Sequence, residues 1–101
     1  MATYVVLGKL TSEGMKSMKQ RWGSGNWPEQ AREAAKRMGI DAKAGPWMTF
    51  GRYDVVGVFE AADDETFAKY TLSIGFTGNI VSETMRAFTG SEFEQIVKSL
   101  P

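Results

Sequence analysis

The sequence predicts an α+β fold in which one antiparallel sheet carries helices on one face. Two runs rich in β-branched or aromatic residues, 3–10 and 53–61, have the composition of strands. Each run is followed by a helix-starting residue and then by apolar residues at helical spacing. Two further strand patterns complete the order β-α-β-β-α-β, with a helix at the end. This order is the ferredoxin-like arrangement, with an antiparallel sheet and helices on one face.

The first half of the chain provides the first strand and a long helical crossover. Both faces of strand 3–10 are largely apolar, so we expect both to be covered. Thr11 or Ser12 caps the following helix. A kink or loop at 22–27 interrupts it, and Asn26 with Glu29 resembles a capping box that restarts it. The apolar stripe of the restarted helix is Ala31, Ala34, Ala35 and Met38, before Gly39 ends it.

The middle of the chain predicts two strands joined by a tight turn. Residues 41–50 form the second strand, which must lie at the sheet edge with a bulge because Gly45-Pro46 cannot complete a central ladder. The segment Phe50-Gly51-Arg52-Tyr53 fits a two-residue hairpin with glycine at its first central position. The third strand then runs over about 53–61.

The remaining segments predict a helix, a strand and a final helix. Asp63 caps the first of these helices, whose inward residues are Phe67, Tyr70, Thr71 and Ile74. Strand four covers about 79–88. Ser91 and Glu94 form a capping box for an amphipathic helix, whose apolar residues are Phe93, Ile96, Val97 and Leu100.

Composition limits the chemistry that the protein can perform. The 101 residues, which we expect to form one domain over 1–101, include no cysteine and no histidine. This excludes disulfides, thiolate nucleophiles, Ser-His-Asp catalysis and zinc sites built on sulfur or imidazole. Acid–base chemistry would need carboxylate, lysine, tyrosine, arginine or water, and a metal would need oxygen ligands. We predict no metal and no cofactor.

Charge and hydropathy limit the kinds of partner that the protein can have. The formal net charge is zero, which argues against nucleic acid as a main partner. Residues 1–53 hold nine Lys/Arg and four Asp/Glu, whereas residues 54–101 hold three and eight. Either one helix carries solvent-exposed cationic side chains and the others carry anionic ones, or a dipolar surface helps copies assemble. No window reaches the ~18 apolar residues of a membrane span, and no signal-peptide pattern is present. We therefore expect a cytoplasmic protein with no membrane partner.

Several short motifs occur in an order that is typical of one known family. They are Phe50-Gly51-Arg52-Tyr53-Asp54-Val55-Val56, Glu60-Ala61-Ala62-Asp63-Asp64-Glu65, Gly78-Asn79-Ile80-Val81 and Glu83-Thr84-Met85-Arg86-Ala87-Phe88-Thr89. On these motifs the chain resembles the GYD-domain proteins of the dimeric α+β barrel group over essentially its whole length. Arg52 departs from the pattern, because the family more often has an acidic residue there. The family is largely without assigned activity, so the resemblance implies a fold more than a function.

The resemblance also implies that two copies pack sheet against sheet as a dimeric α+β barrel. The sequence supports this expectation independently. On the third strand one face holds Tyr53, Val55, Gly57, Phe59 and Ala61, and the other holds Asp54, Val56, Val58 and Glu60. A sheet left open would expose several hundred Å² of apolar surface, more than monomers usually tolerate. We therefore expect a homodimer or higher homo-oligomer.

Four polar residues are candidate catalytic groups: Tyr53, Asp54, Glu60 and Arg86. Tyr53 and Asp54 could place a hydrogen-bond donor and a carboxylate at the mouth of a cavity, or could simply build the hairpin. Glu60 could pair with Arg86 of the same or another subunit as a structural ion pair. The alternative is a carboxylate with a raised pKa that acts as acid or base without histidine.

Three tryptophans are candidates for the wall of a ligand pocket: Trp22, Trp27 and Trp47. They would stack against a planar or apolar small molecule. The alternative is packing in the core and at an interface.

These observations favour a small homo-oligomeric protein that binds a small organic molecule between its helices and its sheet. If it is an enzyme, the resemblance suggests cofactor-free chemistry on a planar or aromatic substrate, such as oxygenation, isomerisation or cyclisation. The alternative is a structural or regulatory assembly module without chemistry.

Overall fold

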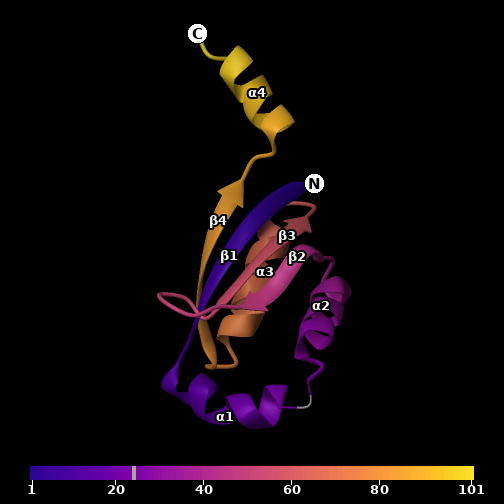
Figure 1. Ribbon diagram of the computed structural model, residues 1–101. Coiled ribbons are helices and arrows are strands. Elements are labelled where there is room, and N and C mark those ends of the chain that lie inside the picture. The colour runs from indigo at the N-terminus through magenta and orange to yellow at the C-terminus, as the bar shows by residue number, and fades with distance from the viewer. Residues whose placement is uncertain (24) are drawn as a thin grey trace.

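A four-stranded antiparallel sheet in the order β2-β3-β1-β4 organises the protein (Figure 1). The computed structural model describes residues 1–23 and 25–101. Its elements are β1 (Ala2–Leu10), α1 (Ser12–Trp22), α2 (Trp27–Arg37), β2 (Asp41–Met48), β3 (Val55–Ala61), α3 (Asp64–Gly75), β4 (Ile80–Ala87) and α4 (Gly90–Lys98). The α+β class and the ferredoxin-like order of strands are therefore confirmed, and the first crossover consists of two helices.

Strand β1 lies in the centre of the sheet and fixes which side chains share a face. Its Tyr4 lies opposite Phe59 of β3 and Arg86 of β4, on the face that the helices cover. Its Val5 lies opposite Val58 and Met85, on the face that no helix covers within the described residues. Because side chains alternate along a strand, each strand contributes to both faces.

Strand β2 is the edge strand that the Gly45-Pro46 pair predicts. It pairs only with β3 in this sheet, and its register shifts between Ala42 and Ala44 and again between Ala44 and Trp47. Gly45 has a φ of 78°, a left-handed conformation that favours glycine. The bulge is therefore confirmed.

The predicted two-residue hairpin is wrong, because the loop between β2 and β3 is longer. The backbone N–H of Thr49 donates to the carbonyl of Asp54 at 2.8 Å, which closes a loop of four residues around Gly51. The Asp54 N–H donates to the carbonyl of Gly8, and an Asp54 carboxylate oxygen accepts from the Leu10 N–H, both at 2.8 Å. These bonds fasten Asp54 to the end of β1, so β3 begins at Val55 and not at residue 53.

The helix starts confirm two predicted caps and correct two others. Thr11 and Asp63 accept hydrogen bonds from the backbone N–H groups of Gly14 and Thr66, as expected. Asn26 makes no capping bond, because its ψ of 14° is not the extended conformation that a capping residue adopts.

The capping box of the last helix lies two residues earlier than predicted. Thr89 and Glu92 form it, and not Ser91 and Glu94. Both pairs have the right spacing, but the helix begins at Gly90, directly after Thr89. The Glu92 carboxylate accepts from the Thr89 N–H, and this bond lowers the pKa of Glu92.

The hydrophobic core lies between α3 and the sheet. The rings of Tyr4 and Phe67 stack in parallel with centroids 4.2 Å apart, and Phe59 and Tyr70 pack against Phe67. Ile40, between α2 and β2, is also fully buried. At the edge of this core, the Tyr4 hydroxyl donates a hydrogen bond to the carboxylate of Asp64. This core places α3 against one half of the covered face.

Helix α4 leads away from the sheet beyond the end of β4 (Figure 1). Its amphipathic pattern is as predicted, but none of its residues is buried. The exposed apolar side chains are Phe93, Ile96, Val97 and Leu100. An apolar helix face is therefore left without cover in the single chain.

Candidate functional site

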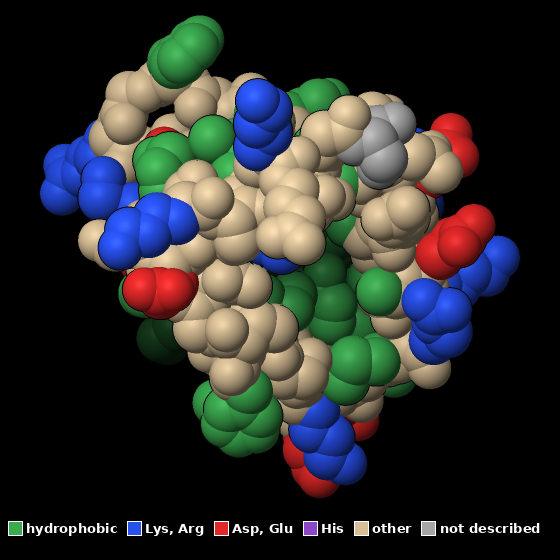
Figure 2. Space-filling model, turned by 90° about the horizontal axis from the view of Figure 1, so that it is seen from below, with side chains coloured by type: hydrophobic (Ala, Val, Ile, Leu, Met, Phe, Trp, Pro, Cys, Tyr) green, Lys and Arg blue, Asp and Glu red, His purple; other side chains and the backbone are tan. Residues whose placement is uncertain are grey.

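A cavity of about 560 Å³ lies between the helices and the covered face of the sheet. Its size falls within the range of small-molecule sites, roughly 300–1,000 Å³. Seen from the end of the molecule where α1 lies, the surface is hollowed and hydrophobic side chains line the hollow (Figure 2). The cavity is lined by Val6, Gly8, Leu10, Arg21, Trp22, Trp27, Gln30, Ala31, Ala34, Pro46, Val55, Gly57, Phe59, Tyr70, Thr71, Ile74, Thr77, Asn79, Ile80 and Ser82.

Aromatic and aliphatic side chains form most of the cavity wall. Trp22 ends α1 and Trp27 begins α2, so the break between the two helices brings their rings together. These rings stack with centroids 4.7 Å apart. Phe59 of β3 and Ile74 of α3 line the cavity from the sheet and from the third helix. Such a wall favours an apolar or planar molecule.

The N-terminal end of α1 is fixed by a close approach to the loop between α3 and β4. Thr11 donates from its backbone N–H to the carbonyl of Asn79 at 3.1 Å and from its hydroxyl to that of Gly78 at 2.6 Å. Gly14 is buried there, and a Cβ at this position would lie 1.9 Å from the Asn79 carbonyl oxygen. Only glycine lets the helix come this close, so Gly14 sets the position of α1 at the cavity.

Helix α2 is held over the sheet by the bulge in β2. Arg32 donates from its Nη1 to the carbonyl of Gly45 at 3.2 Å, and Ala35 is fully buried beneath the helix. Pro46 follows the bulge and lines the cavity, along with Ala31 and Ala34. The small alanine side chains leave the space that bulkier residues would fill.

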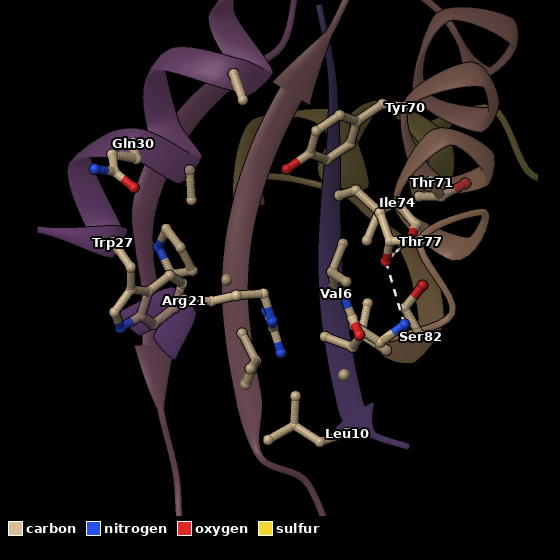
Figure 3. A pocket seen from close by; sticks show the side chains of 18 of the residues that line it. Val6, Leu10, Arg21, Trp27, Gln30, Tyr70, Thr71, Ile74, Thr77 and Ser82 are labelled. Carbon is tan, nitrogen blue, oxygen red and sulfur yellow. Dashed lines mark hydrogen bonds between the residues drawn. The ribbon is translucent and has the colours of Figure 1, made fainter. Parts of the chain in front are cut away.

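Among the described residues that line the cavity, Arg21 is the only charged one. Its Nε donates to the Ser17 hydroxyl and its Nη2 to the Gly14 carbonyl, both at 2.8 Å. Its guanidinium lies over the Trp22 ring, 4.8 Å from the centroid. Among the described residues no carboxylate lies within 4.0 Å of an Arg21 nitrogen. The guanidinium points into the space between helices and sheet (Figure 3).

Tyr70 contributes a second polar group from the opposite wall. Its residue is 7% exposed, and burial raises the pKa of its hydroxyl. The hydroxyl points into the cavity (Figure 3), and no described residue forms a hydrogen bond with it. The hydroxyl oxygen is not fully enclosed by the protein, so it can form a hydrogen bond with a ligand or with water.

Neutral polar side chains complete the lining. They are Gln30, Thr71, Thr77, Asn79 and Ser82. The Thr77 hydroxyl donates to the Ile74 carbonyl at 2.7 Å and accepts from the Asn79 N–H at 3.2 Å, so it serves the helix end. No carboxylate is among the described lining residues, so none of them can act as a carboxylate base.

The four predicted catalytic residues lie outside the cavity lining. Tyr53 and Asp54 belong to the loop before β3, where Asp54 accepts from the backbone of Leu10. The Tyr53 hydroxyl donates to a Glu83 carboxylate oxygen at 3.0 Å, and this bond raises the pKa of Tyr53.

Glu60 and Arg86 do not pair in the single chain. A Glu60 carboxylate oxygen lies 3.7 Å from the Nζ of Lys43 in the edge strand β2. Arg86 lies over the rings of Phe88 and Tyr4, 4.6 and 5.7 Å from their centroids, and donates to main-chain carbonyls. The structure thus places the two charges in different surroundings within one copy.

Of the three predicted pocket tryptophans, Trp22 and Trp27 line the cavity and Trp47 does not. The register shift at the bulge places Trp47 opposite Val56, on the face that the helices leave open, and its side chain is 54% exposed. Pro46 takes the cavity side instead. A bulge changes which residues face which side, and sequence alternation alone does not reveal this.

Sequence reasoning did not single out the two polar groups of the cavity. Arg21 follows Lys16 and Lys19 on α1 and looks like one more solvated cation. Tyr70 was assigned to the inward face of its helix, which is correct, but its hydroxyl was not considered as a ligand contact. The inward position of Tyr70 on its helix was the one signal that the sequence offered.

Two classes of site find no support among the described residues. No group of three or more Asp or Glu is placed to hold a metal ion. No described helix has both the length and the apolar character needed to cross a membrane.

Fold and site together define a ferredoxin-like α+β protein with a cavity between its helices and its sheet. The chain belongs to the GYD-domain family, because the family model described as GYD domain matches residues 4–97. No curated protein and no solved structure matches the chain. The family resemblance read from residues 50–65 and 78–89 is therefore confirmed.

Proposed function

We propose that the protein binds a small organic molecule in the cavity between its helices and its sheet. The observation that carries this proposal is the cavity itself, about 560 Å³ and lined by Trp22, Trp27, Phe59 and Ile74. An open hollow of this size with apolar walls exposes hydrophobic surface to water, and a bound small molecule would cover that surface. Apolar walls with a few polar groups are typical of small-molecule sites.

Binding is supported better than catalysis. The chain has no histidine or cysteine, and the described residues of the cavity lining include no carboxylate. The candidate groups Tyr53, Asp54, Glu60 and Arg86 lie elsewhere. Chemistry without a cofactor on the bound molecule would have to use Arg21 or Tyr70. The geometry supports their use as hydrogen-bond donors to a ligand.

A cavity-filling variant tests the binding proposal. Ala34 is exposed at the cavity, so Ala34→Trp fills part of the space without displacing the core. We expect it to weaken the binding of N-phenyl-1-naphthylamine, a neutral fluorescent probe, by at least tenfold. Ala68→Trp, at an exposed alanine of α3 outside the cavity, should bind the probe as the natural protein does. Equal probe binding by all three proteins, or none by the natural protein, would overturn the proposal.

We also propose that the protein associates with a second copy of itself. Two apolar surfaces of one chain support this proposal: the open face of the sheet and the uncovered face of α4. The apolar residues of the open sheet face are Val5, Leu7, Trp47, Val56, Val58, Val81 and Met85. Val81 is 66% exposed and Met85 49%, far above the exposure of the core residues on the opposite face. Exposed apolar surface of this extent marks an interaction site.

A second copy is the partner that accounts for both surfaces. Two-fold symmetry places the same patch of each subunit in the interface, so an apolar sheet face is complementary to itself. The opposite charges of the two halves of the chain favour contacts between α4, which carries Glu92 and Glu94, and the basic half of the other copy. Light scattering at micromolar concentration should give about twice the chain mass of 11.2 kDa. The monomer mass under these conditions would refute the assembly.

Self-association alone does not distinguish a ligand-binding protein from a pure assembly module. The probe experiment separates them, because an assembly module would form the dimer and leave the cavity unable to bind.

A further inference from the structure

We propose that the natural ligand is an organic acid, with its anionic group bound by Arg21 and a hydrogen-bond acceptor placed at Tyr70. This inference rests on the proposed function, since it concerns the same cavity. It adds a charge and an orientation to the ligand, which the size of the cavity alone does not give. A flat or elongated apolar body would lie against the tryptophans, with its acidic end toward α1.

The argument for an anion begins with the surroundings of Arg21. Arg21 is half-buried in an apolar cavity, so its guanidinium has lost part of its hydration and an anionic partner would stabilise it. The cavity lining provides no carboxylate, and no described acidic group forms an ion pair with Arg21. A ligand with an anionic group would supply the negative charge that the described residues of the lining lack.

The hydrogen bonds of Arg21 orient it for this role. Nε is bonded to Ser17 and Nη2 to the Gly14 carbonyl, so the side chain is held in one direction by its own helix. Among the described residues Nη1 has no hydrogen-bond acceptor. The Trp22 ring supports the guanidinium from one side, 4.8 Å away. A guanidinium fixed in this way loses little freedom when a carboxylate or sulfonate binds.

Tyr70 fixes the second point of contact. Its hydroxyl lies on the wall opposite α1 and faces the cavity without a protein partner (Figure 3). Tyrosine is protonated at neutral pH, and burial raises the pKa of Tyr70 further above its ordinary value. It therefore donates a hydrogen bond to a carbonyl, ether or hydroxyl oxygen of the ligand. Two donors on opposite walls define the direction of the molecule in the cavity.

A matched pair of probes separates this inference from the proposed function. The anionic probe is 8-anilinonaphthalene-1-sulfonate, and the neutral one is N-phenyl-1-naphthylamine, which has the same ring system without the sulfonate. Both are titrated by fluorescence against the natural protein, Arg21→Met and Arg21→Lys. Lys19→Met is the control, since it removes one positive charge from the exposed side of the same helix.

We expect Arg21→Met to weaken the binding of the anionic probe by roughly 10- to 100-fold, the range of a charged hydrogen bond. The affinity for the neutral probe should change by no more than about twofold. Arg21→Lys should restore part of the loss, and Lys19→Met should change neither probe. Tyr70→Phe should lower the affinity of a ligand with an acceptor on that side, tested with the carbonyl-bearing anthraquinone-2-sulfonate, by roughly 3- to 10-fold.

The outcomes distinguish the two claims. If the natural protein binds the neutral probe and Arg21→Met leaves the anionic probe unchanged, the acid inference fails while the binding proposal stands. Equal losses of both probes in Arg21→Met, with no rescue by Arg21→Lys, would show that Arg21 only supports α1, and would also refute the inference. If the natural protein binds neither probe, both claims fail.

Discussion

Replacing Gly14 by alanine tests how closely α1 must approach the sheet to form the cavity wall. In a helix the exchange of glycine for alanine normally stabilises by about 0.5–1 kcal/mol, because glycine loses more conformational freedom on folding. At this position a Cβ would lie 1.9 Å from the Asn79 carbonyl oxygen, where ordinary contact begins at 3.4 Å. Relief requires a movement of roughly 1.5 Å by backbone on both sides, not by a flexible side chain.

The size of the two effects decides the sign of the change. Overpacking of a well-packed contact costs about 1–3 kcal/mol. The movement would also disturb the hydrogen bonds from Thr11 to the carbonyls of Gly78 and Asn79, so the cost falls in the upper part of that range. After subtraction of the helix gain, we expect Gly14→Ala to lower the free energy of unfolding by about 1–2 kcal/mol.

Urea unfolding followed by tryptophan fluorescence measures this difference, at one protein concentration so that association contributes equally. The matched control is Gly75→Ala at the end of α3, where a Cβ would meet nothing within 4 Å. It should leave stability unchanged or raise it by up to about 1 kcal/mol. A Gly14→Ala protein as stable as the natural one would refute the close approach and, with it, the position of α1 at the cavity.

Two further predictions concern the core and the assembly. Burial of Tyr4 and its hydrogen bond to Asp64 raise the pKa of Tyr4 from 10.0 to about 12, so the unfolded chain loses this proton first. The contribution of Tyr4 to stability is complete below pH 10 and is lost as the pH rises toward 12. In urea titrations at pH 10–12, Tyr4→Phe should lack this loss of stability. An identical loss in both proteins would contradict the assignment. For the assembly, Ile96→Glu on the apolar face of α4 should shift light-scattering mass toward the monomer. Gln95→Glu, which adds the same charge at the neighbouring position, should leave the mass unchanged. Equal mass shifts in both variants would exclude the apolar face of α4 from the interface.

Most elements of the fold follow from local rules that the sequence states directly. Asp63 and Thr11 cap their helices because short polar side chains satisfy free N–H groups at helix starts. Pro46 confines its strand to the sheet edge because it has no N–H to donate. These outcomes depend on a few neighbouring atoms, so a single sequence is sufficient to predict them.

Other features depend on contacts between distant parts of the chain and were not predicted. The loop before β3 follows from the bonds of Asp54 to Gly8 and Leu10, which lie more than 40 residues away in sequence. A turn rule applied to Gly51 and its neighbours cannot include such bonds, and it therefore gave a hairpin that was too short. Prediction of the cavity had the same limit, because periodicity shows which face of a helix turns inward and not how far it stands from the sheet.

The candidate site was predicted in part for the same reason. Trp22 and Trp27 stand beside the glycine-rich break between two helices, and their density in the sequence drew attention to them. The role proposed for Arg21 depends on its contact with the Gly14 carbonyl and on the lack of a carboxylate among the described lining residues, and both are properties of the folded chain. A charge is recognised as unusual only when its surroundings are known.

Alternation along β1 separates the two proposed activities physically. Val6 and Gly8 line the cavity, whereas Val5 and Leu7 lie between them on the open face. The proposed ligand binding and the proposed self-association would therefore use opposite faces of the same strand, and substitutions one residue apart should affect one activity without the other. Assembly through the open face leaves the cavity unblocked. The proposed dimer would then have two separate binding sites, one beneath the helices of each subunit.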